Sequence, residues 1–286
     1  MTPLRIALYQ GPAGIPATVD ASLGALDVAA RSAAASGAGL LVCNEMYLTG
    51  YAIGDGVERL AEPADGRSAR RVMEIAAGHG IAIAYGYPER EGAAVFNAAQ
   101  LIGPDGRRLA NYRKTHLFGD FERKYFTPGD TSVVQAELNG LRIGFLICYD
   151  VEFPENVRAH ALAGTDLLLV PTAQMRPFEF VAETVVPVRA FENQLYVAYV
   201  NRCGPEGEFD FVGLSCLSGP DGITRARAGR GEDLIIGDAD PALLHASREA
   251  NPYLRDRRPE LYRPLVRTAP PSSTEIDRTG PRRTTR

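Results

Sequence analysis

Short apolar runs alternate with longer amphipathic stretches through the N-terminal third of the chain. Residues 4–9 (LRIALY) and 39–43 (GLLVC) are mostly apolar and too short for buried helices, so they predict strands. Between them, residues 18–36 carry apolar side chains at helical spacing, start at a Thr or Asp and stop before a glycine. This pattern predicts an amphipathic helix. A helix over 66–79 and a strand over 81–87 repeat the alternation.

The pattern changes further along the chain, where turn sequences join neighbouring apolar runs. Strands are predicted over 94–102 and 107–113, joined by the turn sequence GPDG, and a strand–turn–strand unit over 131–148. GPDG occurs again at 219–222, and two similar hairpins hint at two sheets with internal pseudosymmetry. The remaining predicted elements are helices over 154–163 and 178–193 and strands over 166–171, 195–200, 212–217 and 233–238. Strands mixed with helices, without strict β-α-β regularity, favour a layered α+β or mixed α/β domain.

The C-terminal segment differs in composition from the rest of the chain. No linker interrupts residues 1–245, so we predict one domain over residues 1–250. Residues 251–286 contain nine arginines, four acids and six prolines, and residues 268–286 have almost no apolar side chains. Such a segment buries too little surface to offset its ordering entropy. It is predicted to be a disordered tail or an arm on a partner subunit, with a nucleic-acid-binding tail as the weaker alternative.

Composition excludes several classes of protein. The chain has 286 residues, a net charge of -4 and 45% hydrophobic residues, which is typical of a globular protein without a strongly basic nucleic-acid surface. No run approaches the roughly 18 apolar residues of a transmembrane helix, and the N-terminus does not resemble a signal peptide. The four cysteines show no CxxC or zinc-type spacing. We therefore expect a cytoplasmic protein with free thiols, no bound metal and no membrane or nucleic-acid partner.

Two lysines stand out in a chain whose other basic residues are all arginine. They are Lys114 and Lys124, among 31 basic residues. Codon bias explains the general preference for arginine. A position that stays lysine in such a background can also need a compact ammonium whose pKa is adjustable, which guanidinium does not supply. Composition leaves both explanations open for each lysine.

In three segments, a reactive side chain lies at or just after the end of a predicted strand. Strand ends are where a mixed sheet presents its functional groups. Glu45 follows the run at 39–43, Lys114 follows an alternating strand, and Cys148 closes a strongly apolar strand just before a helix start. A cysteine in such a strand is most often a small buried hydrophobe. A thiol at a strand–helix junction can also meet backbone N–H groups that stabilise a thiolate and later an oxyanion.

If Cys148 is a nucleophile, its base is predicted to be a carboxylate. None of the four histidines suits the role, and His116, beside Lys114, is better explained as a hydrogen-bonded loop residue. Glu45 is the best-placed carboxylate, because it follows the end of a predicted strand. Partial burial there would raise its pKa toward that of a useful base. Lys114 would then stabilise the negative charge of a tetrahedral intermediate.

The ordered segments resemble those of the nitrilase superfamily of carbon–nitrogen hydrolases. The matching pieces are NEMYLTGY around Glu45, YRKTHLFG around Lys114 and ICYDVEFPE around Cys148. Similar patches flank them: RIALYQG near the start, PTAQ at 171–174 and RAFENQLYVAYVNRCG further on. The resemblance covers residues 4–240 and implies a four-layer α-β-β-α sandwich, usually paired into a homodimer.

The resemblance also implies roles for individual residues. Lys114 matches the catalytic lysine, which leaves Lys124 as a surface residue. A second family glutamate matches Glu122 in FERKYFTPG, where the alternative is a solvated glutamate in a charged cluster. The backbone N–H of Tyr149 matches an oxyanion donor. Two residues of the PTAQ segment are further expected to contact substrate, namely Thr172 and Ala173.

The resemblance further implies a branch and a reaction. In nitrilases the nucleophilic cysteine stands in a Cys-Trp-Glu sequence. This chain has Cys148-Tyr149-Asp150 instead and no tryptophan, so the resemblance favours an amidase. The chain is similar to 5-aminopentanamidases and R-stereoselective amidases. The expected reaction hydrolyses a small aliphatic or amino-acid-derived amide, such as an ω-amino amide, to carboxylate and ammonia through a Cys148 thioester, without a cofactor.

Three other functions stay open. An N-carbamoyl amino acid or β-ureido acid amidohydrolase would need cationic donors for a substrate carboxylate, and Arg176 and Arg202 are candidates. A catalytically silent binding protein on the same fold is disfavoured by the complete set of reactive residues. A redox thiol protein is disfavoured because Cys148 has no CxxC partner, while Cys43, Cys203 and Cys216 have no reactive surroundings.

Overall fold

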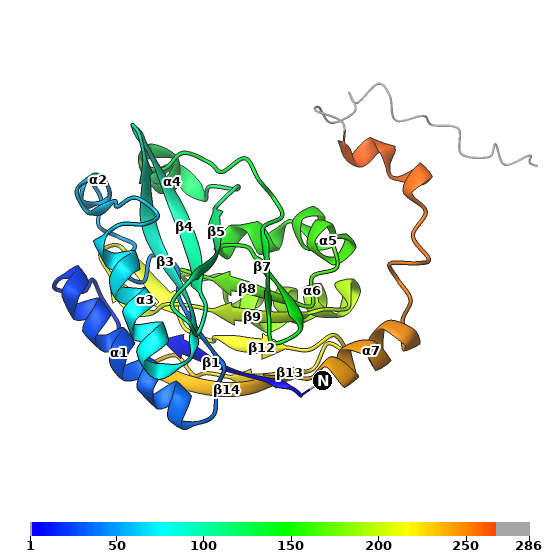
Figure 1. The fold of residues 1–286 in the computed structure, drawn as a ribbon. Helices are drawn as coiled ribbons and strands as arrows, with labels where there is room; N and C mark the ends of the chain where they lie inside the picture. Colours follow the sequence, from blue (N-terminus) through cyan, green and yellow to red (C-terminus); the bar gives the residue numbers. More distant parts are fainter. Residues whose placement is uncertain (1, 267–286) are drawn as a thin grey trace, which may run out of the picture. The chain divides into compact units, whose positions relative to one another are not determined.

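The computed structural model describes residues 2–266 (Figure 1). The chain divides into two compact units, Met1–Tyr253 and Leu254–Arg286. Within the second unit, the described residues form two short 3₁₀ helices, Pro259–Leu261 and Arg263–Val266. Most of the tail predicted over 251–286 lies outside the described residues, so its disorder or arm-like role stays a prediction, as does the domain boundary at residue 250.

Two six-stranded sheets form the centre of the first unit. Sheet A has the order β14-β1-β2-β3-β4-β5 and sheet B the order β13-β12-β9-β8-β7-β6. The strands of sheet A are β1 (Leu4–Gln10), β2 (Leu40–Cys43), β3 (Ala82–Glu91), β4 (Ala94–Ile102), β5 (Arg108–Arg113) and β14 (Asp233–Ala239). Those of sheet B are β6 (Gln135–Leu138), β7 (Leu141–Phe145), β8 (Leu167–Pro171), β9 (Tyr196–Val200), β12 (Cys216–Ser218) and β13 (Thr224–Arg227). A separate hairpin pairs β10 (Cys203–Glu206) with β11 (Phe209–Val212).

The two sheets repeat one strand plan. β1, β2 and β3 run parallel, and the antiparallel pair β4–β5 follows them. β7, β8 and β9 are likewise parallel and are followed by the antiparallel pair β12–β13. The two GPDG turns occupy equivalent places, between β4 and β5 and between β12 and β13. The hint of two sheets with internal pseudosymmetry therefore matches the observed topology.

Helices cover the outer face of each sheet, which completes four layers (Figure 1). The pair α1 (Val19–Ala35) and α3 (Arg67–His79) packs on sheet A, while α5 (Pro154–Leu162) and α6 (Val186–Asn193) lie on the side of sheet B. The other helices of this unit are α2 (Gly56–Leu60), α4 (Gly119–Tyr125), α7 (Pro241–Ala250), the 3₁₀ helix Cys148–Glu152 and the π-helix Val181–Val185. The predicted α-β-β-α sandwich is confirmed.

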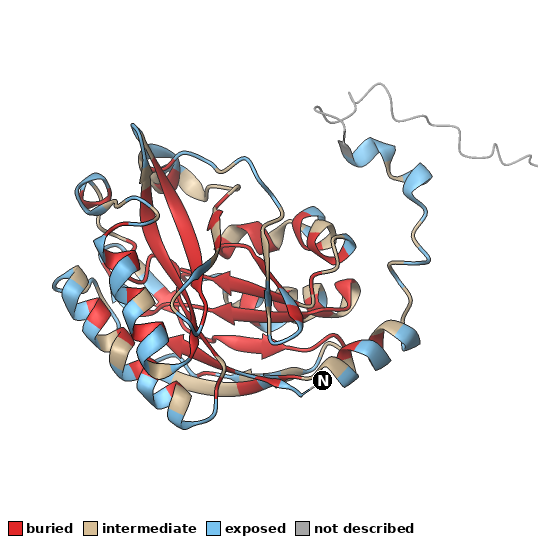
Figure 2. Cartoon of the chain, in the orientation of Figure 1, coloured by how far each residue is buried: buried red, intermediate tan, exposed pale blue. Residues whose placement is uncertain are grey.

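The local chemistry of α1 explains why this helix forms where the pattern predicts it. Thr18 caps its start, with the hydroxyl oxygen accepting the Ala21 N–H at 3.1 Å. Leu23 and Leu26 point into the core beneath sheet A, whereas the opposite face of the helix is exposed (Figure 2). Gly37 follows the helix with a φ of +77°, a left-handed conformation that favours glycine.

Several predicted elements differ from the observed ones. The strand predicted over 212–217 is wrong, because Gly213 and Leu214 have φ values of +67° and +60° and separate β11 from β12. The strand–turn–strand over 131–148 is shorter than predicted and ends at Phe145. The helix predicted over 178–193 includes a π-helical turn before α6. The helices α2, α4 and α7 were not predicted.

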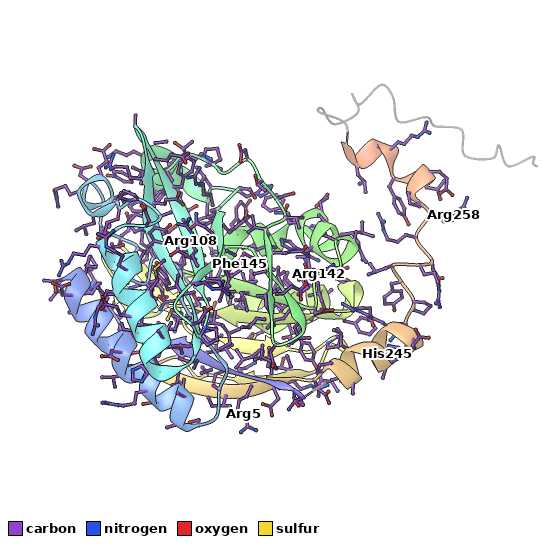
Figure 3. All side chains as sticks on the ribbon, viewed as in Figure 1. Arg5, Arg108, Arg142, Phe145, His245 and Arg258 are labelled. Atoms are coloured by element: carbon purple, nitrogen blue, oxygen red, sulfur yellow. The ribbon has the colours of Figure 1, made fainter. Side chains whose placement is uncertain are left out.

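The sheets place their strand ends around one region of the interior. Phe145, the last residue of β7, is completely buried in the middle of the molecule, whereas Arg142 near the other end of β7 is exposed (Figure 3). The segment that follows β7 therefore starts inside the unit. Across residues 2–266, every helix is too short or too polar to span a lipid bilayer.

Candidate active site

Four predicted site residues lie in the interior around the strand ends. Glu45 follows β2, Lys114 directly follows β5, and Cys148 begins the 3₁₀ helix after β7. Glu122 comes from α4, a helix that the sequence did not predict. The relative exposures of Glu45, Lys114, Glu122 and Cys148 are 0%, 1%, 0% and 6%. A lysine and two glutamates this deeply buried must compensate one another's charge.

Lys114 is held between the two glutamates. Its Nζ donates to Glu45 Oε1 at 2.8 Å and to Glu122 Oε1 at 2.6 Å. Burial by itself lowers the pKa of Lys114, but the negative charges of Glu122 and Glu45 outweigh it and hold the pKa well above the ordinary value. An ammonium has three donors, so two bonds to carboxylates leave one for another acceptor. Lys114 is thus a permanently charged donor inside the site.

Glu45 has one engaged oxygen and one free oxygen. Oε1 accepts from Lys114 Nζ and from Asn97 Nδ2, the latter at 2.6 Å. Oε2 is buried and has no hydrogen-bond partner among the described residues. Burial raises the pKa of Glu45 to about 7, against the lowering effect of Lys114. A carboxylate with a free oxygen and a pKa near neutrality can accept a proton at physiological pH.

Glu122, in contrast, has hydrogen-bond donors on both carboxylate oxygens. Oε1 accepts from Lys114 and from the Tyr51 hydroxyl at 2.9 Å, and Oε2 accepts the Phe118 backbone N–H at 2.6 Å. The alternative of a solvated glutamate is wrong because this side chain is completely buried. Two positions later, the Lys124 side chain is 66% exposed, as predicted for a surface lysine. Glu122 therefore holds Lys114 and has no free oxygen for a proton.

Cys148 lies at a sharp turn rather than in a strand. β7 ends at Phe145, so the prediction that the cysteine closes a strand is wrong; its φ of +48° is unusual for a non-glycine residue. Sγ lies 3.7 Å from Gln174 Oε1. Burial first and the charge of Glu45 second raise the pKa of the Cys148 thiol well above its ordinary value, while Lys114 and the Ala173 backbone N–H lower it. The resting thiol therefore keeps its proton, and attack needs a base.

Two of the three predicted oxyanion and substrate residues, Tyr149 and Ala173, lie beside the cysteine. Tyr149 is the second residue of the 3₁₀ helix, where backbone N–H groups have no partner within the helix. The Ala173 N–H faces the thiol. Thr172 donates its N–H to Val200 at 2.8 Å, and its carbonyl accepts the Glu45 N–H at 3.4 Å. Direct contact of these residues with substrate stays a prediction.

Two polar residues at the site were missed by the sequence analysis. Asn97, on β4, donates to Glu45 and also lies 3.4 Å from Glu122 Oε1. Gln174 contacts the nucleophile, and the Asn201 side chain accepts its backbone N–H at 2.7 Å. PTAQ was recognised as a segment, but nothing in it marked the glutamine. An asparagine inside an apolar strand was the only available signal for Asn97.

The arginines predicted to bind a substrate carboxylate already have acidic partners. Arg202 is buried and pairs with Glu206 at 2.5 Å. Arg176 has a half-exposed side chain and pairs with Asp210 at 2.8 Å and with Glu179 at 2.9 Å. His116, considered above as a loop residue, interacts with the Asp150 carboxylate through Nδ1 at 3.0 Å. It belongs to the surroundings of Lys114 rather than to the nucleophile.

Comparison with known proteins agrees with this geometry. The family described as carbon–nitrogen hydrolase matches residues 5–249. The chain belongs to the carbon–nitrogen hydrolase family. This protein is therefore a hydrolase of carbon–nitrogen bonds, and the resemblance to the nitrilase superfamily is confirmed.

Individual relatives cover most of this carbon–nitrogen hydrolase. It is 52% identical over 261 residues to a Pseudomonas protegens protein named the hydrolase in the pqqF 5′ region, a match covering 91% of this chain and 90% of that protein. An (R)-stereoselective amidase from a Pseudomonas species is 37% identical over 222 residues, which cover 77% of this chain and 79% of the relative. An amidase from Nesterenkonia sp. AN1, solved with the acetamide moiety of fluoroacetamide covalently added at its active-site cysteine, is 35% identical with a TM-score of 0.82. That match covers 91% of this chain and 95% of the amidase.

Proposed function

We propose that this carbon–nitrogen hydrolase is an amidase that acts through a Cys148 thioester. The observation that carries the proposal is the buried cluster in which Lys114 joins Glu45 and Glu122 beside the cysteine. The proposed substrate is a small aliphatic or amino-acid-derived amide, such as an ω-amino amide. The amidases among the relatives support this class of reaction.

The first half of the proposed reaction forms the thioester. Glu45 Oε2 takes the thiol proton of Cys148, and Sγ attacks the amide carbonyl carbon. The negative charge that develops on the carbonyl oxygen is stabilised by the free donor of Lys114 and by the Tyr149 N–H. When the tetrahedral intermediate collapses, the carbon–nitrogen bond breaks, Glu45 returns its proton to the nitrogen, and ammonia leaves.

The second half hydrolyses the thioester with the same groups. Glu45 takes a proton from a water molecule, whose oxygen attacks the thioester carbonyl carbon. Lys114 and Tyr149 again stabilise the oxyanion. Collapse of this intermediate breaks the carbon–sulfur bond, the proton held by Glu45 returns to Sγ, and the carboxylic acid leaves and ionises. The cycle consumes one water and needs no cofactor.

Hydrolysis of N-carbamoyl amino acids or β-ureido acids is the second proposed activity within the family. It would use the same nucleophile, but the substrate carboxylate would need a cation. Arg202 and Arg176 would have to exchange a present acidic partner for the substrate. This requirement makes the simple amide the favoured substrate. A catalytically silent binding protein is disfavoured because the complete reactive cluster is present.

We also propose a cellular location and an oligomeric state for the enzyme. A cytoplasmic location is included because the four cysteines show no CxxC or zinc-type spacing. A homodimer is included because the chain resembles a family in which pairing is usual. No nucleic-acid or membrane partner is included, in keeping with the net charge of -4.

The deciding experiment measures ammonia release from a panel of substrates. The panel contains short aliphatic amides, ω-amino amides, N-carbamoyl amino acids and β-ureido acids, each tested with the wild-type protein and with Cys148→Ala. Release from an amide that depends on Cys148 is the expected result. Release from carbamoyl compounds alone would replace the amidase with the second activity. No release from any compound would favour the silent protein.

Glu122→Gln is expected to lower amide turnover by roughly 100-fold, as when a reacting group moves by about 1 Å. The glutamine NH₂ must replace either Oε2, which accepts the Phe118 N–H, or Oε1, which accepts from Lys114 Nζ. In either orientation one of these two donors loses its acceptor. Cys148 and the free oxygen of Glu45 are unchanged, so alkylation of Cys148 by iodoacetamide should survive. Both rates are measured on the same preparation.

The matched control is Asp120→Asn, two residues earlier in α4, where the side chain is fully exposed. It should leave both turnover and alkylation unchanged. Normal amide turnover in Glu122→Gln would remove Glu122 from the proposed mechanism and leave Glu45, Lys114 and Cys148.

A further inference from the structure

Another buried carboxylate lies two residues after the nucleophile and takes no part in the proton transfers proposed above. Asp150 has a relative exposure of 0%. Four hydrogen-bond donors converge on its two side-chain oxygens, at distances between 2.8 and 3.1 Å, and His116 Nδ1 lies 3.0 Å from Oδ1. A buried charge needs such partners to be tolerated. The donors come from the segments that carry the two reacting groups, the lysine and the cysteine.

On one side, the Asp150 carboxylate holds the segment of Lys114. The Tyr112 hydroxyl donates to Oδ2 at 2.8 Å. The Thr115 hydroxyl and the His116 backbone N–H donate to Oδ1 at 2.9 and 2.8 Å. These contacts bracket Lys114 in the sequence, one before it and two after it. Asp150 thus holds the residues on both sides of Lys114, while the Lys114 backbone N–H itself donates to the Asn97 carbonyl at 2.8 Å.

On the other side, the same carboxylate closes the turn of Cys148. The Ile147 backbone N–H donates to Asp150 Oδ2 at 3.1 Å. In the reverse direction, the Asp150 backbone N–H donates to the Ile147 carbonyl at 3.1 Å. Cys148 and Tyr149 lie inside this closed loop. Its two bonds support the left-handed conformation of Cys148, which a non-glycine residue rarely adopts.

We infer that Asp150 is a positioning residue, which sets the distance between the Cys148 nucleophile and the Lys114 ammonium. The inference rests on the amidase mechanism proposed above. An oxyanion formed at Cys148 is stabilised only if the lysine donor lies where the charge develops. Because one carboxylate binds both segments, a change in it alters their relative position without removing either reacting group.

Asp150→Asn tests the inference, because it keeps the size of the side chain and changes its hydrogen bonding. Hydroxyl groups of Tyr112 and Thr115 can reverse and accept from an amide, but backbone N–H groups cannot. If the NH₂ replaces Oδ2, the Ile147 N–H loses its acceptor; if it replaces Oδ1, the His116 N–H does. Either orientation disturbs one of the two segments.

Asp166→Asn is the matched control, because Asp166 forms the same kind of bond pair at the other end of β7. Asp166 precedes β8, and its Oδ2 accepts the Arg142 backbone N–H at 2.9 Å while its own N–H donates to the Arg142 carbonyl at 2.8 Å. It therefore closes the opposite end of β7 by the same pair of bonds. This variant should lose stability but keep the wild-type kcat.

We expect Asp150→Asn to lower kcat by roughly 100-fold, the effect of misplacing reacting groups by about 1 Å. KM should change less than threefold. Alkylation of Cys148 by iodoacetamide needs the thiol and its base but no oxyanion donor, so its rate should fall less than tenfold. All rates are measured well below the unfolding midpoint of each variant and are divided by the folded fraction.

A purely structural role predicts a different set of results. In that case kcat per folded molecule equals that of wild type, or falls equally in Asp150→Asn and Asp166→Asn, and either result would overturn the inference. The amidase mechanism is judged separately by Cys148→Ala. If that variant is inactive while Asp150→Asn has normal kcat, the mechanism stands and only the role of Asp150 is lost. If Cys148→Ala stays active, the mechanism itself is wrong, and the inference is rejected with it.

Discussion

Cys148→Ala is expected to reduce amide turnover below detection, a loss on the order of 10⁴-fold or more. The substitution removes Sγ, the atom proposed to form the thioester, and leaves the base and the lysine in place. The only hydrogen bond that Sγ donates to a described side chain, to Gln174, is long at 3.7 Å, so the fold loses little. Turnover is measured as ammonia release, and the acyl-enzyme as a mass increase of the intact protein during turnover.

The control is Cys216→Ala, which removes another buried thiol. On β12, the Cys216 sulfur lies 3.9 Å from the Ala182 carbonyl, outside the reactive cluster. It should keep both turnover and the mass increase. Activity of Cys148→Ala within tenfold of wild type would show that another residue is the nucleophile. Similar thermal unfolding midpoints of the two variants would confirm that the comparison concerns chemistry and not folding.

Three of the site residues could be placed from sequence because of how sheets are built. Glu45 and Cys148 each follow a short apolar run and Lys114 follows an alternating strand, and both patterns predict strands of a sheet. Chains leave a mixed sheet at its strand ends, so polar residues there meet across long separations in sequence. The strands are buried together in the two sheets, so the reactive side chains that follow them lie close to one another.

The role of Glu122 in the cluster could be suggested only by resemblance. Its helix, GDFERKY, has Glu122 as its one buried residue, so no apolar face marks the helix. A glutamate among charged neighbours normally indicates a solvated surface. Its burial depends on Tyr51 and Lys114, which are distant in the sequence and are brought to it by the tertiary fold.

Asn97 and Asp150 illustrate a second limit. Asn97 lies in a correctly predicted strand, but the pattern does not reveal that its amide faces two glutamates across the site. Asp150 was visible as an acid near the nucleophile, while its partners around Lys114 lie 34 to 38 residues earlier in the chain. Hydrogen bonds of this kind depend on the pairing of sheets, which local periodicity does not encode.

Glu45→Gln is expected to lower amide turnover by roughly 10²–10⁴-fold, the usual contribution of a general base. The present Oε1 position accepts from Lys114 and Asn97, so the glutamine oxygen takes that position and its NH₂ replaces the free Oε2. An NH₂ in that position cannot accept the thiol proton. Glu89→Gln is the control, since Glu89 is also buried but pairs with Arg113 away from the cysteine. It should keep kcat within threefold of wild type.

The pH dependence makes the test of Glu45 specific. Burial raises the pKa of Glu45 to about 7, and a base acts only when deprotonated, so kcat/KM of the wild type should rise as pH increases through about 7. Iodoacetamide alkylation of Cys148 should rise over the same range. In Glu45→Gln the thiol must lose its proton unaided, and its raised pKa moves the alkylation profile to higher pH. An unchanged alkylation profile in Glu45→Gln would show that a different group accepts the proton of Cys148.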